Sequence, residues 1–182
     1  MSDGRTPFEV FRDVRFLGNS RLAPCSHLLK QAPCRRWLEA NADPDETVLY
    51  VGYDHTEERR VPGTRKGWEP WQVQFPMTEP PHLTKDDMFA WCRDLGITPP
   101  RLYRWADHNN CWGRCARGKK HWSALWANDP AGFAEAEAAE QGIRDHLGKP
   151  VTILREVRRG EAHSLTLAEL RQRLENEAEV PR

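Results

Sequence analysis

TVLYVGY, which spans Thr47–Tyr53, is the stretch that decides the fold of this chain. It is almost continuously apolar and rich in strand-forming residues, a pattern typical of a strand buried on both faces of a parallel sheet. Such a strand predicts parallel neighbours on either side. The chain then passes through Gly52 into the charged segment DHTEERR. Because ligands in open α/β sheets bind beyond the carboxyl ends of the strands, we expect Gly52–Arg60 to form a ligand-binding loop.

Helical and extended patterns alternate around this strand and indicate an α/β domain with several helices. Further strands are expected at Gln72–Phe75 and Val151–Val157. Start and stop signals predict a helix that begins at Pro7 with Thr6 as its cap, and a second helix at Ser26–Ala40 that ends or kinks at Pro33. Further helices are predicted at Thr84–Gly96, Lys119–Asn128, Ala131–Leu147 and Leu165–Glu177. Ser164 or Thr166 would cap the last of these. We assign residues 1–160 to one domain and residues 161–182 to a C-terminal helix.

The composition narrows the classes of protein to which the chain can belong. Its 182 residues suit one domain, and 27 basic side chains balance 27 acidic ones. This balance provides no overall attraction to nucleic acid. The segment Met1–Gly18 is charged throughout, unlike a signal peptide, and no apolar stretch is long enough to span a bilayer. We therefore expect a cytoplasmic protein that does not bind membranes.

Four of the five cysteines fall into two short pairs, Cys25 with Cys34 and Cys111 with Cys115. In a reducing cytosol, paired cysteines are more often ligands or catalytic groups than disulfides. Thiolates favour iron–sulfur clusters, zinc or copper(I), so a shared metal or cluster is one hypothesis. The alternative is that each thiol packs separately as a small apolar group, as we expect for Cys92 in its helix. Three histidines are alternative ligands in place of Cys34: His27, His108 and His121.

An ordered series of segments resembles the phosphoadenosine phosphosulfate reductase-like family of the adenine nucleotide alpha-hydrolase superfamily, especially its phage and mobile-element members. The likeness covers about Pro7 to Trp126. The segments are TPFEVFRDVRFL, PCSHLLKQAPCRRWL, LYVGYDHTEERR, WEPWQVQFPM, LTKDDMFAWCRDLGITPPRLYRW and HNNCWGRCARGKKHW. The resemblance implies that the chain is the C-terminal portion of a doubly wound domain with a mostly parallel sheet.

The resemblance also implies roles for individual residues. Cys25, Cys111 and Cys115 match family cysteines that hold an iron–sulfur cluster or serve sulfur chemistry, with zinc as the alternative metal. Cys34 has no matched position in the family and is a candidate for the fourth ligand because it pairs with Cys25 in the sequence. Lys30 matches a lysine that approaches a phosphate, although a solvated lysine is the alternative. Gly52, Glu57 and Arg60 match the substrate loop after the central strand, where Arg60 would bind phosphate or sulfate and Glu57 would orient it or bind a metal. The alternative is a solvated, self-paired helix start.

Two departures from the family pattern affect the expected function. The glycine-rich pyrophosphate loop that should precede TPFEVF is absent, so a partner chain that carries this loop, or a second copy, would complete the site for ATP or a related adenine nucleotide. The arginine-rich loop and the C-terminal cysteine of the sulfate-assimilating reductases are also missing. We therefore expect nucleotide-dependent sulfur chemistry on a sulfur-containing small molecule. The alternatives are a non-catalytic, metal-stapled interaction module and an inactive fragment.

Overall fold

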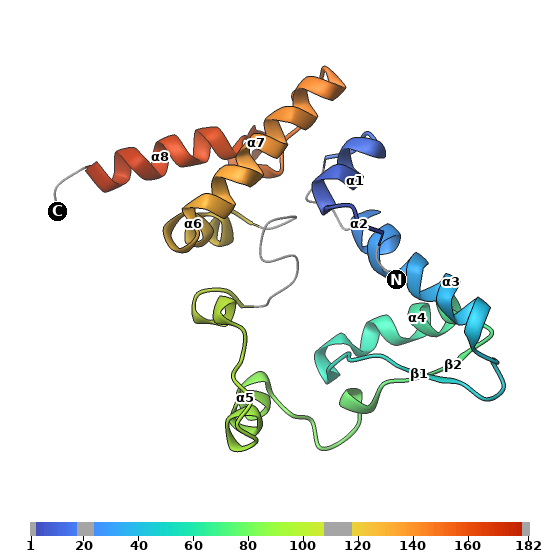
Figure 1. Cartoon of the computed structure of the whole chain (residues 1–182). Coiled ribbons are helices and arrows are strands. Elements are labelled where there is room, and N and C mark those ends of the chain that lie inside the picture. The colour runs from blue at the N-terminus through green and yellow to red at the C-terminus, as the bar shows by residue number, and fades with distance from the viewer. Residues whose placement is uncertain (1–2, 18–23, 108–117, 180–182) are drawn as a thin grey trace. The chain divides into compact units, whose positions relative to one another are not determined.

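The computed structural model describes residues 3–17, 24–107 and 118–179, which form two compact units (Figure 1). Unit 1 is the segment Ala32–Pro99, and unit 2 combines the described residues of Ser2–Gln31 and Pro100–Arg182. The predicted ligands Cys111 and Cys115 lie outside the described residues.

Unit 1 contains a strand–helix–strand crossover. Strands β1 (Val48–Tyr50) and β2 (Gln72–Gln74) run parallel, and the connection between them holds the 3₁₀-helix η2 (His55–Arg60) and helix α4 (Val61–Trp68). Parallel strands need a crossover of this kind because a tight hairpin cannot join them. The arrangement confirms the predicted α/β class and both of the strands expected in this region.

The prediction that Thr47–Tyr53 is buried on both faces is wrong. Only Val48–Tyr50 forms a strand, and Tyr50 keeps 69% of its surface exposed. Within the described residues, β1 pairs with β2 alone. A strand with one neighbour cannot reach the burial typical of a central parallel strand, which has strands beside it and helices on each face.

Helix α3 (Ala32–Asn41) is fastened to the end of α4 by one arginine. The Arg35 guanidinium donates to the carbonyl oxygens of Gly67 and Glu69, both at 2.8 Å, and lies 5.6 Å from the centroid of the Trp71 ring. These bonds satisfy carbonyl groups that the end of a helix leaves without partners. The buried apolar side chains of unit 1 come mainly from α3 and the β2 region: Leu38, Trp71, Val73 and Phe75.

The helix predicted for Ser26–Ala40 is present, but it is not uniform. Helix α2 (Pro24–Ser26) is followed by a π-helical turn, η1 (His27–Gln31), before α3 begins. Pro33 is the second residue of α3 and directly follows η1, so its missing N–H lies where the helix changes type.

After β2, the 3₁₀-helix η3 (Pro76–Thr78) leads to helix α5 (Lys85–Asp94). Thr84 caps α5 as predicted: its hydroxyl accepts from the Asp87 amide at 3.2 Å, and the Asp87 carboxylate accepts from the Thr84 amide at 2.8 Å. The hydrogen bond from the Thr84 side chain is the main reason that the pKa of Asp87 is lowered. The expectation that Cys92 is a core residue is wrong, because this side chain is only half-buried and α5 contains no buried residue.

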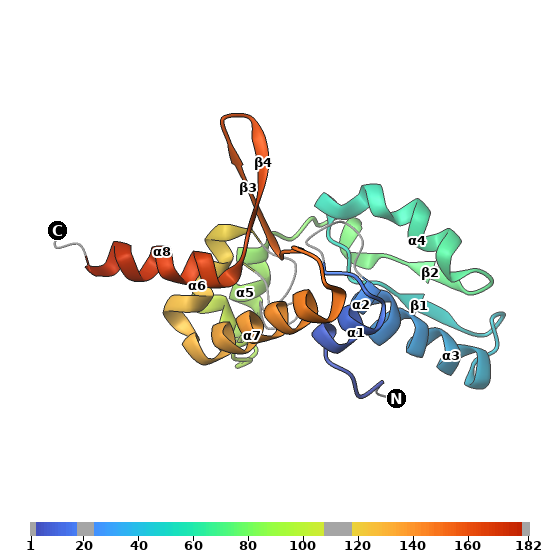
Figure 2. The same ribbon diagram turned by 90° about the horizontal axis from the view of Figure 1, so that it is seen from above.

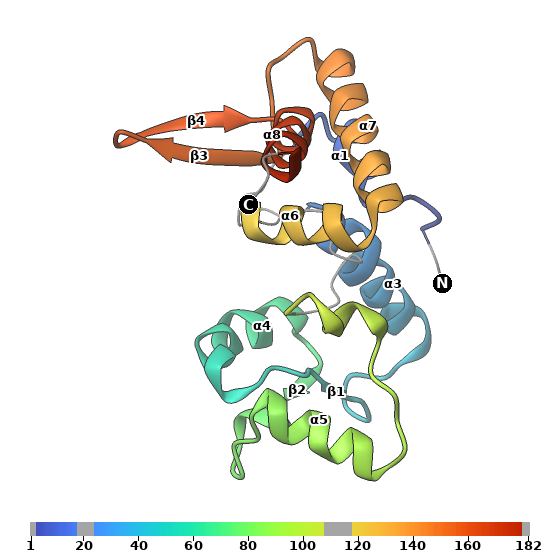
Figure 3. The ribbon, with the colours of Figure 1, turned by 90° about the vertical axis from the view of Figure 1, so that its left-hand side faces the viewer.

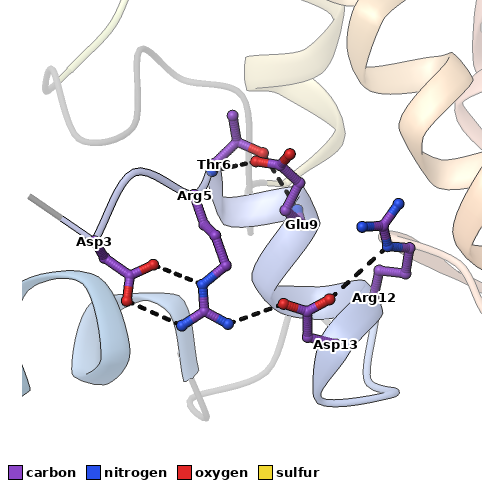
Figure 4. Close-up of polar contacts among 6 residues, drawn as sticks. All are labelled: Asp3, Arg5, Thr6, Glu9, Arg12 and Asp13. Carbon is purple, nitrogen blue, oxygen red and sulfur yellow. Dashed lines mark hydrogen bonds and ion pairs between the residues drawn. The ribbon is translucent and has the colours of Figure 1, made fainter.

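Unit 2 begins with helix α1 (Pro7–Asp13), whose start is fixed by the polar contacts in Figure 4. Thr6 caps the helix as predicted, since its hydroxyl accepts from the Glu9 amide at 3.2 Å and its own amide donates to the Glu9 carboxylate at 2.6 Å. Arg5 donates to Asp3 at 2.6 Å and to Asp13 at 2.9 Å, which ties the preceding segment to the end of the helix.

Besides α1, α2 and η1, the helices of unit 2 among the described residues are η4 (Arg101–Arg104), α6 (Lys119–Asn128), α7 (Pro130–Leu147) and α8 (Leu167–Glu179). Helix α7 contacts α1, α6 and α8 (Figure 3), and the rings of Trp122 and Phe133 pack edge to face at 6.0 Å. Both rings belong to the apolar core of this unit, which also includes Phe11, Ile143 and Leu170. The three helices predicted after residue 118 are confirmed, and their ends differ from the prediction by at most two residues.

One carboxylate is buried in this core. Glu140 on α7 is 2% exposed and accepts hydrogen bonds from the backbone amides of Ile153 at 2.8 Å and Leu167 at 2.7 Å. Ile153 precedes the next strand and Leu167 begins α8. The side chain therefore joins α7 to two later elements through their backbones. Burial raises the pKa of Glu140 against the opposing effect of these two bonds.

Strands β3 (Leu154–Arg158) and β4 (Glu161–Leu165) form an antiparallel hairpin that projects from the helices of unit 2 (Figure 2). The strand expected at Val151–Val157 is confirmed with shifted ends, but β4 was not predicted. The expected domain boundary between residues 160 and 161 falls in the turn of this hairpin. Among the described residues, no helix combines the length and apolar character needed to cross a membrane.

Candidate functional site

The candidate site lies in unit 1, where the chain leaves the two parallel strands. Because β1 and β2 point the same way, the segments that follow them emerge at one edge of the sheet. These segments contain η2 and η3, which contact each other. Ligands of open parallel sheets bind at this edge, and the segment Gly52–Arg60, which we predict to be a ligand-binding loop, lies here.

Asp54 turns the chain into η2. Its carboxylate accepts from the Thr56 amide at 2.8 Å and from the Thr56 hydroxyl at 2.6 Å. The hydrogen bond from the Thr56 side chain is the largest cause of the lowered pKa of Asp54. An ionised aspartate at the start of a helical turn satisfies amide groups that have no other partner, so the local sequence fixes where the loop becomes helical.

Arg60 is held on an aromatic ring at the end of η2. Its guanidinium lies 4.1 Å from the centroid of the Tyr53 ring and forms an ion pair with Glu57. The Tyr53 hydroxyl lies 3.0 Å from the Thr64 hydroxyl, which fixes the ring from the α4 side. The Arg60 side chain is still 49% exposed, so part of the guanidinium faces solvent.

A second arginine extends this arrangement. The rings of Tyr53 and Phe75 are stacked with centroids 5.6 Å apart, and the Arg65 guanidinium lies 5.5 Å from the Phe75 centroid. Phe75 is 3% exposed, which anchors the aromatic pair in the unit. Two guanidinium groups are thus carried by one fixed pair of rings. Guanidinium groups bind phosphate and sulfate through paired N–H donors, so this cluster has the chemistry of an anion site.

Two histidines stack at the same edge. The rings of His55 and His82 have centroids 5.0 Å apart, and the His82 Nε2 lies 3.2 Å from the Thr78 carbonyl oxygen. The Nδ1 atom of His55 is buried and has no hydrogen-bond partner among the described residues. Stacked rings direct their nitrogens in parallel rather than toward one ion, so this pair is not a metal site by itself.

Gly52 is exposed and lies at the start of the loop. A Cβ atom at this position would meet only the Met77 sulfur, at 4.0 Å, and the residue has no positive φ angle. The backbone here does not require glycine. The predicted role of Gly52 in substrate binding is therefore not supported by its conformation, and it stays a prediction that rests on the resemblance.

The other predicted residues lie in different places. Cys25 on α2 is 6% exposed and belongs to the apolar core of unit 2, whereas Cys34 on α3 is exposed and belongs to unit 1. Lys30 on η1 is exposed in unit 2 and has no ion pair with any residue in the described ranges. Of the predicted site residues, the structure brings Glu57 and Arg60 into contact. The other predicted residues within the described ranges are divided between the two units.

The cysteines fit a metal or cluster only in part. Cys25 has surroundings that exclude water, whereas Cys34 faces solvent. No three histidine, cysteine or acidic side chains among the described residues converge on one point. Since Cys111 and Cys115 lie outside those residues, the ligand set stays a prediction.

The site also contains residues that the sequence did not single out, namely Tyr53, Phe75 and Arg65. A signal for the first two was present, because each aromatic residue is the last residue of a predicted strand. Their stacking depends on the parallel register of β1 and β2, which no local pattern specifies.

Comparisons of the chain with family models, with curated proteins and with solved structures found no match.

Proposed function

We propose that the chain is a phosphoadenosine phosphosulfate reductase-like protein that takes part in nucleotide-dependent sulfur chemistry. Its fold would be the C-terminal portion of an adenine nucleotide alpha-hydrolase-like domain. In this proposal Arg60 binds a phosphate or sulfate group of ATP or a related adenine nucleotide. The observation that carries the proposal is the position of Arg60, held on Tyr53 beyond the carboxyl end of β1.

The contacts of Arg60 suit this task. The Tyr53 ring covers one face of the guanidinium and Glu57 accepts from one edge, so the group keeps a fixed orientation. A guanidinium has five N–H donors in one plane, and an ion pair with one carboxylate leaves others for a ligand. An oriented guanidinium loses less entropy when it binds an oxyanion than a free one does.

The thiols would hold the second part of the site. We assign Cys25, Cys34, Cys111 and Cys115 to an iron–sulfur cluster, with zinc as the alternative. A bound cluster would supply electron transfer, and either group would staple the fold. The chain's contribution at Cys25 is an apolar environment of core side chains that keeps water from the sulfur atom.

A partner chain would complete the nucleotide site. Within the described residues β1 has one neighbour, and Tyr50 on this strand is 69% exposed. Edge strands pair readily with strands of other chains. A strand from a partner that carries the pyrophosphate loop, or from a second copy, would bury this edge and bring backbone amides to the phosphates.

The anion site is tested by NMR titration of the full chain with ATP and with sodium sulfate. We expect shifts at the Arg60 Nε–H and at the amides of η2, because these groups surround the proposed anion. Arg60→Ala should weaken binding by about 10- to 100-fold, the equivalent of a charge-assisted hydrogen bond of about 1.5–3 kcal/mol. Arg59→Ala is the matched control, since Arg59 is exposed and makes no ion pair within the described residues. Equal effects of the two substitutions would contradict the proposal.

The metal site is tested by anaerobic purification, absorbance spectroscopy and analysis for iron, sulfide and zinc. A brown protein with iron and sulfide supports the cluster, and a colourless protein with stoichiometric zinc supports the alternative. Cys111→Ser should lose the metal, whereas Cys92→Ser should keep it, because Cys92 lies outside the proposed ligand set. A metal-free protein, or equal loss in both variants, would contradict the assignment.

A non-catalytic interaction module is the second candidate, and one feature favours it. Helix α5 and the turn after it expose large apolar side chains: Trp91 is 59% exposed, Leu95 60% and Ile97 53%. Surfaces of this kind often bind other proteins. This candidate predicts that the metal is present while ATP and sulfate cause no shifts at η2 in the titration.

A further inference from the structure

The β3–β4 hairpin, defined here as the ribbon Leu154–Leu165, is anchored at its base and exposed along most of its length. Leu154 and Leu165 are opposite each other in the core, with 1% and 0% exposed. Beyond this pair, every residue from 155 to 164 is exposed except the half-buried Glu156. The ribbon extends away from the helices of unit 2 in Figures 2 and 3. Its function therefore does not come from covering the core of this unit.

The tip of the ribbon is a tight turn. Arg159 and Gly160 have φ angles of 51° and 85°, and the strands pair in register up to Arg158 and Glu161. A two-residue turn with positive φ at both positions matches the right-handed twist of the strands and gives a well-defined hairpin. The first of these positions favours glycine or asparagine, so the turn itself does not require the arginine side chain of Arg159.

The two faces of the ribbon differ in charge. Glu156, Arg158, Glu161 and His163 share one face. On this face Glu156 forms ion pairs with Arg158 and with Arg173 of α8, the latter at 2.9 Å, so its charge is already neutralised. The second carboxylate of this face, Glu161, is 83% exposed and lies 3.9 Å from His163. The other face carries Arg155, Val157, Ala162 and Ser164 and has no carboxylate, as all residues of the ribbon are described. Arg155 and Arg159 make no ion pair with any described residue.

We propose that the ribbon inserts into the major groove of double-stranded DNA, with Arg155 and Arg159 on the phosphates. Five-residue strands at about 3.4 Å per residue span about 17 Å, so a ribbon that lies flat in the groove is long enough to reach the phosphates on its rims. A two-stranded ribbon is one of the elements that fit the groove width of about 12 Å. The proposal is independent of the nucleotide site, and it places a local basic surface on a chain whose overall charge is balanced.

A second copy of the chain is a less suitable occupant of the ribbon. Pairing of two ribbons edge to edge would bring their arginines together, and charged side chains on edge strands oppose this association. The exposed apolar surface is also small, since Val157 is its one large apolar side chain beyond the base. DNA provides the complementary charge and needs no apolar partner surface.

Fluorescence anisotropy with a labelled DNA duplex of two helical turns, measured over a series of salt concentrations, tests the proposal. The full chain should bind, and log K should fall with log salt concentration. The double variant R155A/R159A should weaken binding equally on unrelated sequences and reduce the slope by about 1.8, since each phosphate contact contributes about 0.9. The control R36A/R93A removes two exposed arginines of unit 1 and should leave the slope unchanged.

Three results would overturn the proposal. The first is no binding at low salt, and the second is an equal loss of slope in the control. The third is self-association in sedimentation experiments that R155A/R159A abolishes in the absence of DNA, which would identify a second copy as the occupant. Circular dichroism spectra that match the wild type would show that both variants are folded, because the substituted side chains are exposed.

Discussion

Substitution of Glu140 by glutamine tests how unit 2 is held together. Both carboxylate oxygens accept a backbone amide, from Ile153 at 2.8 Å and from Leu167 at 2.7 Å, and the residue is 2% exposed. Glutamine keeps one acceptor and turns an NH₂ group toward the other amide. One buried amide then loses its partner, which costs about 1–3 kcal/mol. Glu137→Gln is the control, because Glu137 pairs with the 40% exposed Arg171, and exposed pairs contribute about 0–1 kcal/mol.

Urea unfolding followed by circular dichroism measures this difference, and hydrogen exchange localises it. The Ile153 and Leu167 amides should be protected in the wild type, and one of them should lose protection in Glu140→Gln. Burial raises the pKa of Glu140 above 4.5, so the folded chain binds more protons than the unfolded chain above this pH. The free energy of unfolding of the wild type should therefore fall as the pH rises from 4.5 through the raised pKa of Glu140. The free energy of unfolding of Glu140→Gln should not show this fall. If Glu140→Gln is no less stable than Glu137→Gln, the buried carboxylate does not join these elements.

Three further predictions concern separate features of the structure. The Arg173 and Arg158 hydrogen bonds lower the pKa of Glu156 from 4.5 to about 2, so the stability that this group contributes is present above pH 4.5 and is lost as the pH falls toward 2. Glu156→Gln should remove that acid dependence from urea unfolding curves, and an unchanged dependence would argue against the ion pairs. Thr84→Ala should cost about 1 kcal/mol through loss of the α5 cap, measured by hydrogen exchange in α5; unchanged exchange would refute the capping box. Gly160→Ala should destabilise the hairpin by about 1–2 kcal/mol because of its φ angle of 85°, whereas Gly52→Ala should be neutral; the reverse order in thermal unfolding would contradict both assignments.

The sequence predicted those elements whose signals are local. Thr6 and Thr84 each have an acidic residue three positions later, and both form the capping boxes that this spacing favours. The strand after Thr47 and the helices after residue 118 were likewise predicted from their apolar patterns. Local propensity, caps and periodicity agree at these positions, so tertiary contacts did not alter the outcome.

Features that depend on distant residues could not be predicted in this way. The apolar run of Thr47–Tyr53 predicts a central strand, yet the number of neighbours that a strand has is set by other segments. The exposed strand β4 reads EAHSL, which lacks the alternation of a half-buried strand and gave no signal. Its pairing with β3 follows from the turn at Gly160, whose positive φ is visible only in the folded chain.

The candidate site shows the same division. The sequence placed Glu57 and Arg60 in a ligand loop from the general behaviour of parallel strands. The aromatic support of Arg60 came only from the structure, since Tyr53 and Phe75 are distant in sequence and meet through the sheet register. The ligand set of four cysteines rests on spacing and resemblance, and half of it lies outside the described residues.

The most direct test of the nucleotide site compares ATP binding to the wild type, Arg60→Lys and Arg59→Lys. Lysine keeps the positive charge and removes the planar fork, so the comparison isolates the oriented guanidinium from simple charge attraction. We predict that Arg60→Lys raises the dissociation constant about tenfold, which corresponds to about 1.4 kcal/mol, and that Arg59→Lys leaves it unchanged. Wild-type affinity in Arg60→Lys would contradict the claim that the guanidinium held on Tyr53 recognises the nucleotide.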